Sequence, residues 1–168
     1  MAMEALGRLF DVSIGSVPTD AVAAAITGKR VSLRHAGGVT IVVTCSAGST
    51  DILDVDLQQH TASTGGTTAD LDIIDHYYYK DETTLDGDET WTRATQTAAS
   101  EITNVGSASA EQILVIEVEA SQLSDGYKYV SLDVPDLGTN GTKYVSILYF
   151  LRDLHVQRKP ANLVAPLS

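Results

Sequence analysis

Apolar residues alternate with polar residues at a period of two along much of this chain, which is the spacing of half-buried β-strands. Phe10–Ile14, Val39–Cys45 and Ile52–Leu57 all show this alternation, and the last of them places Asp54 and Asp56 on its polar side. Gly-, Asn- and Asp-containing turns separate such segments about every ten to twelve residues. We therefore predict an all-β fold, a β-sandwich of the jelly-roll type or a related barrel.

The second half of the chain gives the same prediction. Strands are expected at Leu71–Lys80, Thr90–Thr97, Gln112–Glu119, Lys128–Val134 and Lys143–Leu151, with a hairpin at Asn140-Gly141. The last strand, KYVSILYFL, has apolar residues on both faces. Such a strand is expected in the middle of a sheet or beneath another subunit.

Two segments depart from the strand pattern. Thr19–Thr27 (TDAVAAAIT) predicts one short N-terminal helix, because Thr19 or Asp20 can cap it and alanines favour it. Residues 155–168 contain Pro160, Pro166 and spaced apolar residues without alternation. We expect a single domain over residues 1–154 and an extended C-terminal arm over residues 155–168 that lies on a neighbouring surface.

Charge is distributed unevenly along the chain. The formal net charge is −11, and residues 51–89 hold 11 of the 22 acidic residues with one basic residue, Lys80. The tail after Asp153 contains Arg158 and Lys159 and no acidic side chain. An acidic molecule is repelled by phosphate backbones, so we expect no nucleic-acid partner. The apolar runs are too short to cross a bilayer, so we expect no membrane partner.

Catalytic machinery is not expected. The single cysteine, Cys45, closes an apolar strand and is interpreted as a small buried hydrophobe, and the four histidines lie far apart in sequence. The acidic segment Asp81–Glu89 is the best candidate for binding calcium, but it matches no EF-hand spacing, so a solvated hairpin tip is favoured. We predict a protein that is not an enzyme, with no catalytic residue, no cofactor and no metal ion.

The run Tyr77-Tyr78-Tyr79 places aromatic rings alternately on both sides of a strand. In a sandwich one side is core and the other is exposed, so at least one ring should lie on the surface. Exposed tyrosine is enriched at protein interfaces. Seven residues are predicted to contribute to an interface: Tyr77, Tyr78, Tyr79, Arg152, Arg158, Leu163 and Leu167.

About two thirds of the chain resembles a group of small virion proteins of tailed bacteriophages, the capsid decoration or minor capsid proteins. The similarity lies in Gln112–Val134, with its Asp-Gly-Tyr turn, in the segment Tyr144–Leu167 that ends in an Arg-x-x-x-x-x-Arg-x-Pro-Ala tail, and in LDIIDHYYYKDE followed by the Trp91 strand. The resemblance implies a symmetric, multi-copy protein that binds the outside of a capsid shell and has no catalytic residues.

These observations lead to one expected function and two alternatives. The expected function is a structural virion protein, made in the host cytoplasm, that binds the major capsid protein on the capsid exterior as a homo-oligomer, a trimer or another symmetric cluster. The basic N-terminal and C-terminal parts would then face an acidic shell. The alternatives are a head–tail joining or tail structural module, and a carbohydrate-binding β-sandwich with Trp91 or Tyr78 as its aromatic platform.

Overall fold

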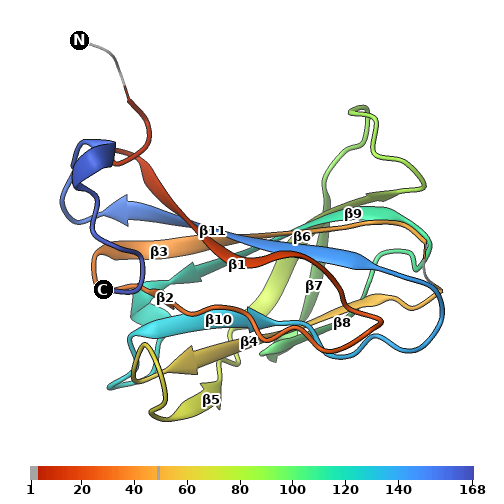
Figure 1. Cartoon of the computed structure of the whole chain (residues 1–168), viewed down its shortest axis with the longest axis horizontal. Coiled ribbons are helices and arrows are strands. Elements are labelled where there is room, and N and C mark those ends of the chain that lie inside the picture. Colours follow the sequence, from red (N-terminus) through yellow and green to blue (C-terminus); the bar gives the residue numbers. More distant parts are fainter. Residues whose placement is uncertain (1–3, 49) are drawn as a thin grey trace.

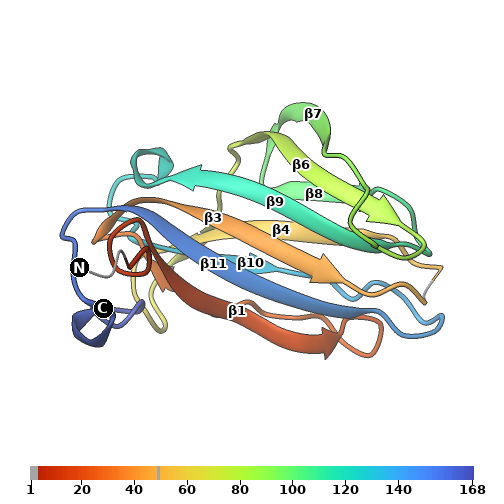
Figure 2. The ribbon, with the colours of Figure 1, turned by 90° about the horizontal axis from the view of Figure 1, so that it is seen from above.

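The alternating segments pair into two antiparallel sheets that pack face to face, and Figures 1 and 2 show the larger sheet lying across the smaller one. This computed structural model describes residues 4–48 and 50–168. The larger sheet has the order β1 (Phe10–Asp20), β11 (Tyr144–Leu154), β3 (Ala36–Cys45), β9 (Glu111–Glu119), β6 (Ile74–Glu82) and β7 (Thr92–Ala99). The smaller sheet has the order β2 (Val31–Ser32), β10 (Tyr129–Asp133), β4 (Leu53–His60) and β5 (Thr68–Asp70), with β8 (Glu101–Val105) also paired to β4.

The hydrophobic core lies between the inner faces of the two sheets. Ile41, Ile147 and Tyr149 from the larger sheet and Leu57 from the smaller one are fully buried there. The Tyr149 hydroxyl reaches across the core and accepts a hydrogen bond of 3.0 Å from the backbone N–H of Leu132 in β10. This contact ties the central strands of the two sheets together, in addition to the apolar burial that dominates their packing.

The prediction of an all-β sandwich is confirmed, and the strand segments predicted from alternation are found at nearly the predicted places. Asp54 and Asp56 lie half-exposed on the outer side of β4, opposite three buried apolar residues, as predicted. Cys45 is buried, and its thiol donates a hydrogen bond to the side-chain oxygen of Gln112. Burial raises the pKa of that thiol to about 11, which fits a structural residue.

The predicted helix at Thr19–Thr27 is wrong. Strand β1 continues to Asp20, which pairs with Tyr144 of β11. Ala21 is fully buried, and its backbone N–H donates to the carbonyl of Lys143. The Asp20 carboxylate accepts the N–H of Val22, which turns the chain instead of capping a helix. Long-range pairing with β11 therefore outweighs the helical preference of the alanines.

Helical structure in the described residues is confined to two short 3₁₀ turns, at Ala120–Gln122 and Pro160–Asn162. No helix within residues 4–48 and 50–168 is long and apolar enough to cross a bilayer.

The C-terminal segment, residues 155–168, folds back along the end of its own sandwich, beside the segment that precedes β1 (Figure 1). It makes one 3₁₀ turn and is otherwise irregular. The basic residues Arg8, Arg158 and Lys159 are exposed at this end of the molecule.

Candidate functional site

An apolar row crosses the outer side of the larger sheet. In the strand register, Ile14 of β1 lies opposite Leu148 of β11, Leu148 opposite Val42 of β3, Val42 opposite Val115 of β9, and Val115 opposite Tyr78 of β6. Side chains alternate between the two faces of a sheet, so these five lie on the side away from the core. Figure 2 looks onto the sheet that they cross.

The row belongs to a wider apolar surface, which we call the outer apolar face. Val12 pairs with Phe150 beside the row. Ile113 lies on β9, two residues before Val115 of the row. Tyr144 and Trp91 are the most exposed of these side chains, at 51% and 50%. The face consists of Val12, Ile14, Val42, Tyr78, Trp91, Ile113, Val115, Tyr144, Leu148 and Phe150. An apolar patch that spans most of a sheet marks an interaction surface more often than chance exposure does.

Strand β11 produces this surface because it is apolar on both sides. Val145, Ile147, Tyr149 and Leu151 fill the core, whereas Leu148 and its alternate neighbours point outward and stay half-exposed. Strand β1 adds an inversion, since Asp11 is buried while Val12 and Ile14 are exposed. The apolar residues of the edge strand therefore extend the outer face instead of the core.

One end of the outer apolar face carries a shallow aromatic hollow. It is lined by Tyr78, Trp91, Val115 and Glu117. The Lys80 ammonium lies 5.1 Å from the centre of the Trp91 ring, within the range of a cation–π contact. The hollow therefore combines two aromatic rings with one carboxylate and one ammonium group.

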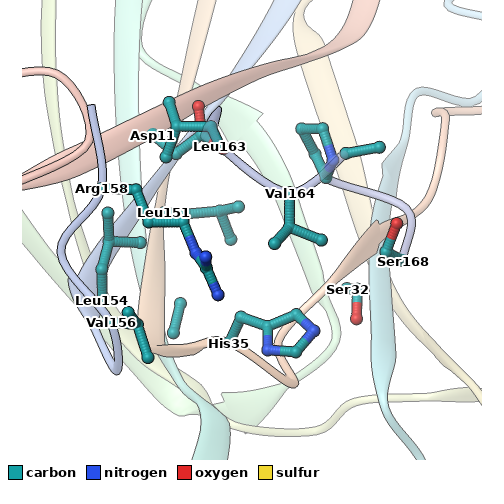
Figure 3. A pocket seen from close by; sticks show the side chains of 13 residues that line it. Asp11, Ser32, His35, Leu151, Leu154, Val156, Arg158, Leu163, Val164 and Ser168 are labelled. Atoms are coloured by element: carbon teal, nitrogen blue, oxygen red, sulfur yellow. The ribbon is translucent and has the colours of Figure 1, made fainter. Parts of the chain in front are cut away.

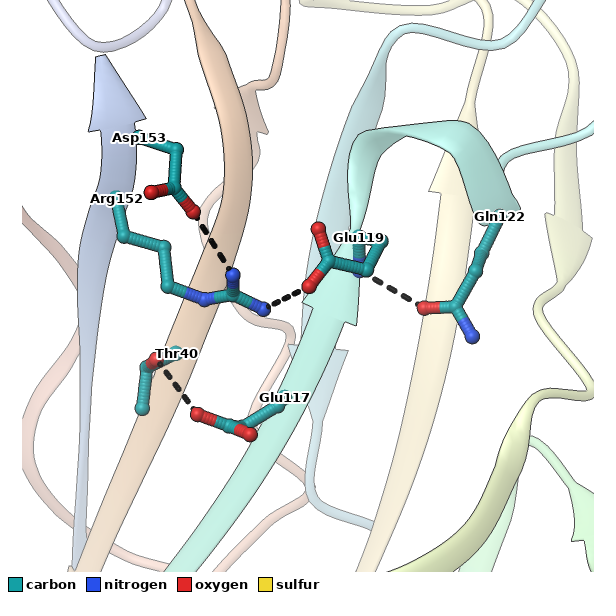
Figure 4. A network of polar contacts seen from close by, with 6 residues as sticks. All are labelled: Thr40, Glu117, Glu119, Gln122, Arg152 and Asp153. Atoms are coloured by element: carbon teal, nitrogen blue, oxygen red, sulfur yellow. Dashed lines mark hydrogen bonds and ion pairs between the residues drawn. The ribbon is translucent and has the colours of Figure 1, made fainter.

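Arg152 lies on the outer side of β11, two residues past Phe150, in a polar cluster that includes Glu117 of the hollow (Figure 4). Its guanidinium contacts the Glu119 carboxylate at 2.6 Å and the Asp153 carboxylate at 3.0 Å. Thr40 donates a longer hydrogen bond to Glu117 nearby. The apolar row is therefore bordered by charges of both signs.

The three tyrosines predicted as interface residues divide between the two sides of β6. Tyr77 and Tyr79 pack against the core with their ring centres 6.1 Å apart, and burial raises the pKa of the Tyr77 hydroxyl. Tyr78 lies on the outer side, where His76 contacts its ring edge-on. The run thus supplies one outward ring, which agrees with the expectation that at least one would lie on the surface.

The remaining predicted interface residues are not brought together with Tyr78. Arg158 and Leu163 line a space beneath the C-terminal segment, and Leu167 is 42% exposed near the chain end. Arg152 borders the outer apolar face and contacts Glu119 of β9 rather than Tyr78. Most residues of the outer apolar face were not predicted from the sequence. The apolar residues on both sides of Lys143–Leu151 could have indicated that β11 contributes to such a face.

The outer side of the smaller sheet has the opposite chemistry. Asp133, Asp56 and Glu101 occupy one register row on β10, β4 and β8. Burial, and the neighbouring Asp56 carboxylate, raise the pKa of Asp133 against the effect of a 2.9 Å hydrogen bond from the Gly28 N–H. Adjacent to this row, the His60 ring bonds to the hydroxyls of Thr68 and Ser131, each at 2.9 Å.

The acidic loop predicted as the best calcium candidate gathers three carboxylates. Oxygens of Glu82, Asp88 and Glu89 lie within 4.8 Å of one another at the surface. The Glu89 carboxylate already accepts the backbone N–H groups of Asp86 and Gly87. Part of this cluster is therefore used to shape the loop.

No family model matches the chain, and searches of curated proteins and of solved structures also found no match. Function therefore has to be inferred from the chemistry of the two outer sheet sides and the C-terminal segment.

Proposed function

We propose that this chain is a structural virion protein that binds the outer surface of a phage capsid through its outer apolar face and thereby stabilises or decorates the shell. The observation that supports this is the continuous row from Ile14 through Leu148 to Tyr78, on a chain with a net charge of −11. Covering that row would remove apolar surface from water. The acidic remainder of the chain would keep the unbound molecule in solution.

The size of the face suits a stable contact. Six strands spaced about 4.8 Å apart span roughly 24 Å, and the outward residues of Tyr144–Phe150 extend about 20 Å along the strands. The flat footprint of roughly 500 Å² is of the order of the ~800 Å² that each partner contributes to a standard interface. Tyr78, Trp91 and Tyr144 are residue types enriched in such contacts.

The partners that fit this proposal are the major capsid protein and further copies of the chain in a symmetric cluster. Arg8, Arg158 and Lys159 lie at the end of the sandwich beside the start of β1, so they would contact an acidic part of the shell at the border of the docked larger sheet. Replacing Arg158 and Lys159 by Glu should then weaken capsid binding at low salt. Unchanged binding at low salt would contradict this orientation.

The direct test is to mix the purified chain with capsids of the same phage that lack it, and to image them by cryo-electron microscopy. Ordered extra density at symmetry positions is expected, with the larger sheet towards the shell. Bare capsids with the chain left in solution would contradict the proposal. A ring formed by the chain alone would instead favour a head–tail joining or tail module.

Matched variants test whether the outer apolar face makes the contact. Ile14→Asp places a charge on an exposed position of β1, and Thr103→Asp places the same charge on an exposed position of β8. Ile14→Asp should reduce capsid binding at least tenfold, because it leaves a buried charge in the interface. Thr103→Asp should bind like the wild type, and equal binding by both variants would exclude this face.

A second function, carbohydrate binding, is favoured by the aromatic hollow. Sugars stack on aromatic rings, and Tyr78 and Trp91 line this hollow with the Glu117 carboxylate as a hydrogen-bond acceptor. Trp91→Ala should abolish any binding found on a glycan array, whereas Tyr144→Ala, an equally exposed aromatic elsewhere on the face, should not. Absence of glycan binding by the wild type would remove this candidate.

A further inference from the structure

The C-terminal segment is held on its own sandwich by few contacts. Within residues 4–48 and 50–168, three backbone hydrogen bonds connect it to the body: His155 N–H to the His35 carbonyl, Arg158 N–H to the Gly7 carbonyl, and Ser32 N–H to the Pro166 carbonyl. Each is between 2.8 and 3.0 Å long. No side chain in residues 155–168 is fully buried. Segments with few buried apolar contacts detach at low free-energy cost.

The surface beneath the segment is shaped to receive it. Leu154, Leu163, Val164 and Pro166 line the space between segment and body, and the Arg158 side chain points into it (Figure 3). Gly7 lets the backbones meet, because a Cβ there would lie 2.3 Å from the Arg158 carbonyl oxygen. We call this surface, formed by the body beside Gly7, Ser32, His35 and Leu151, the tail groove.

Backbone strain lies at the base of the segment. Asp153, two residues before it, has a φ of 53°, in the left-handed region, which Asp enters more readily than most side chains but at a cost that glycine does not bear. It lies beside Gly37, whose Cβ position would be 2.8 Å from the Asp153 Cβ. A change of Asp153 to the extended conformation would relieve the strain and redirect all residues after it away from the body.

We propose that residues 155–168 exchange between two copies of this chain, each segment occupying the tail groove of its partner. The partner's groove fits the segment because the same contacts already form within one chain. Relief of strain at Asp153 favours the exchanged form, and strained hinges are where such exchange is expected. The exchange needs a high local concentration to compete with the intramolecular contact. It concerns the chain alone and does not depend on capsid binding.

Paired cysteines test the exchange directly. In Ser32→Cys/Pro166→Cys, the closed form would give a disulfide within one chain, and the exchanged form a covalent dimer. The full-length variant is held near 1 mM, the effective concentration typical of a short flexible link, then diluted and oxidised. A covalent dimer on a non-reducing gel that grows with protein concentration is expected. Formation of only the intramolecular disulfide at every concentration would overturn the proposal.

Two hinge variants separate strain from charge. Asp153→Asn and Asp153→Gly both remove the ion pair with Arg152, but only glycine relieves the left-handed strain. Asp153→Gly should lower the dimer association constant about fivefold for each hinge relative to Asp153→Asn. Equal dimerisation of the two would contradict a role for strain.

Gly7→Ala provides the control for the groove, because its Cβ would block the segment in both closed and exchanged forms. This variant, with folding checked by circular dichroism, should form no covalent dimer in the cysteine-pair background. A covalent dimer that persists would show that the segments meet elsewhere, and the tail groove would be excluded. Since capsid is absent from these experiments, their failure leaves the proposed capsid binding untouched.

Discussion

The outer sides of the two sheets differ in how their strands use the alternating pattern. In the smaller sheet, β4 buries Leu53, Val55 and Leu57 and exposes carboxylates, as expected for a sheet with one wet side. In the larger sheet, β11 is apolar on both sides, a pattern more typical of strands covered on both faces. One side is thus built to face water and the other resembles a core surface that lacks its cover.

The outer sides of the two sheets also differ in how many polar side chains they carry and in the hydrogen bonds that these side chains make. On the smaller sheet, Gln58 donates to Asp56 and Asp70, and His60 bonds to two hydroxyls. These contacts are made within the chain, although Oδ1 of Asp56 is buried without a hydrogen-bond partner among the described residues. In the row through Leu148 and Val42 the Tyr78 hydroxyl is the one side-chain polar group, so covering the row costs little desolvation. The larger sheet is therefore the better docking side.

The largest expected effect separates the inner from the outer side of β11. Ile147→Ala removes a fully buried side chain and should lower the free energy of unfolding by about 2–5 kcal/mol. Leu148→Ala, one residue further on, removes a half-exposed side chain and should cost less than about 1 kcal/mol. Urea denaturation of the purified variants measures both values. Equal losses would mean that Leu148 is part of the folding core and that the two sides of β11 do not differ in their contribution to stability.

The next effect is a pH dependence on the smaller sheet. Burial, and then Arg30, lower the pKa of His60 from 6.5 to about 4. The unfolded state therefore binds a proton more readily, so the contribution of His60 to stability should fall as the pH drops from about 6.5 to about 4 and be constant below that. At about 1.4 kcal/mol for each pKa unit, the loss is on the order of 3–4 kcal/mol.

Replacement of His60 should flatten this dependence. His60→Gln is expected to be less stable than the wild type at pH 7, because buried hydrogen bonds are changed, but to lose less stability on acidification. His155→Gln removes an exposed histidine and should keep the wild-type slope. An unchanged slope in His60→Gln would assign the acid sensitivity to other groups.

The sandwich could be predicted from the sequence because alternation reports directly on one-sided burial. That signal was sufficient for β4, β9 and β11. It failed at Thr19–Thr27, where the burial of Ala21 depends on β11, a strand that is distant in the sequence. The hairpin predicted at Asn140-Gly141 was also wrong, because the flanking strands β10 and β11 belong to different sheets.

The candidate site was harder to predict because its members come from distant strands. Ile14, Leu148 and Val115 meet only through register, and a local pattern contains no register between distant strands. Tyr78 was predicted only as a member of the run Tyr77-Tyr78-Tyr79, and the sequence left open which of the three rings faces outward. Val12 and Ile14 alternate equally well, but a pattern of period two does not say which side faces the core.

A smaller effect concerns the acidic row of the smaller sheet. Like charges directly opposite each other on neighbouring strands are destabilising, and Asp56 lies between Asp133 and Glu101. Asp56→Asn should raise the free energy of unfolding by about 0.5–1 kcal/mol at neutral pH and low salt. It should also bring the pKa of Asp133 down towards its usual value, which NMR titration measures. Asp125→Asn, in an exposed turn, removes one charge without touching the row and should change stability little. An equal rise in the free energy of unfolding of Asp125→Asn would attribute the effect to the net charge of the chain and not to the acidic row.

The smallest effect is expected at the border of the outer apolar face. Glu119→Gln weakens the 2.6 Å contact with Arg152, whose guanidinium keeps its second contact with Asp153. Because the Glu119 carboxylate is about half exposed, the loss should be only about 0.3–1 kcal/mol and should shrink as salt is added. Thermal unfolding at low and high salt measures it, with Glu117→Gln as the comparison, because Glu117 attracts Arg152 by its charge but makes its hydrogen bond to Thr40. If Glu119→Gln leaves stability unchanged but alters capsid binding, the ion pair between Glu119 and Arg152 serves to orient the docked surface. The two sheet sides would then differ in their role in assembly more than in their role in folding.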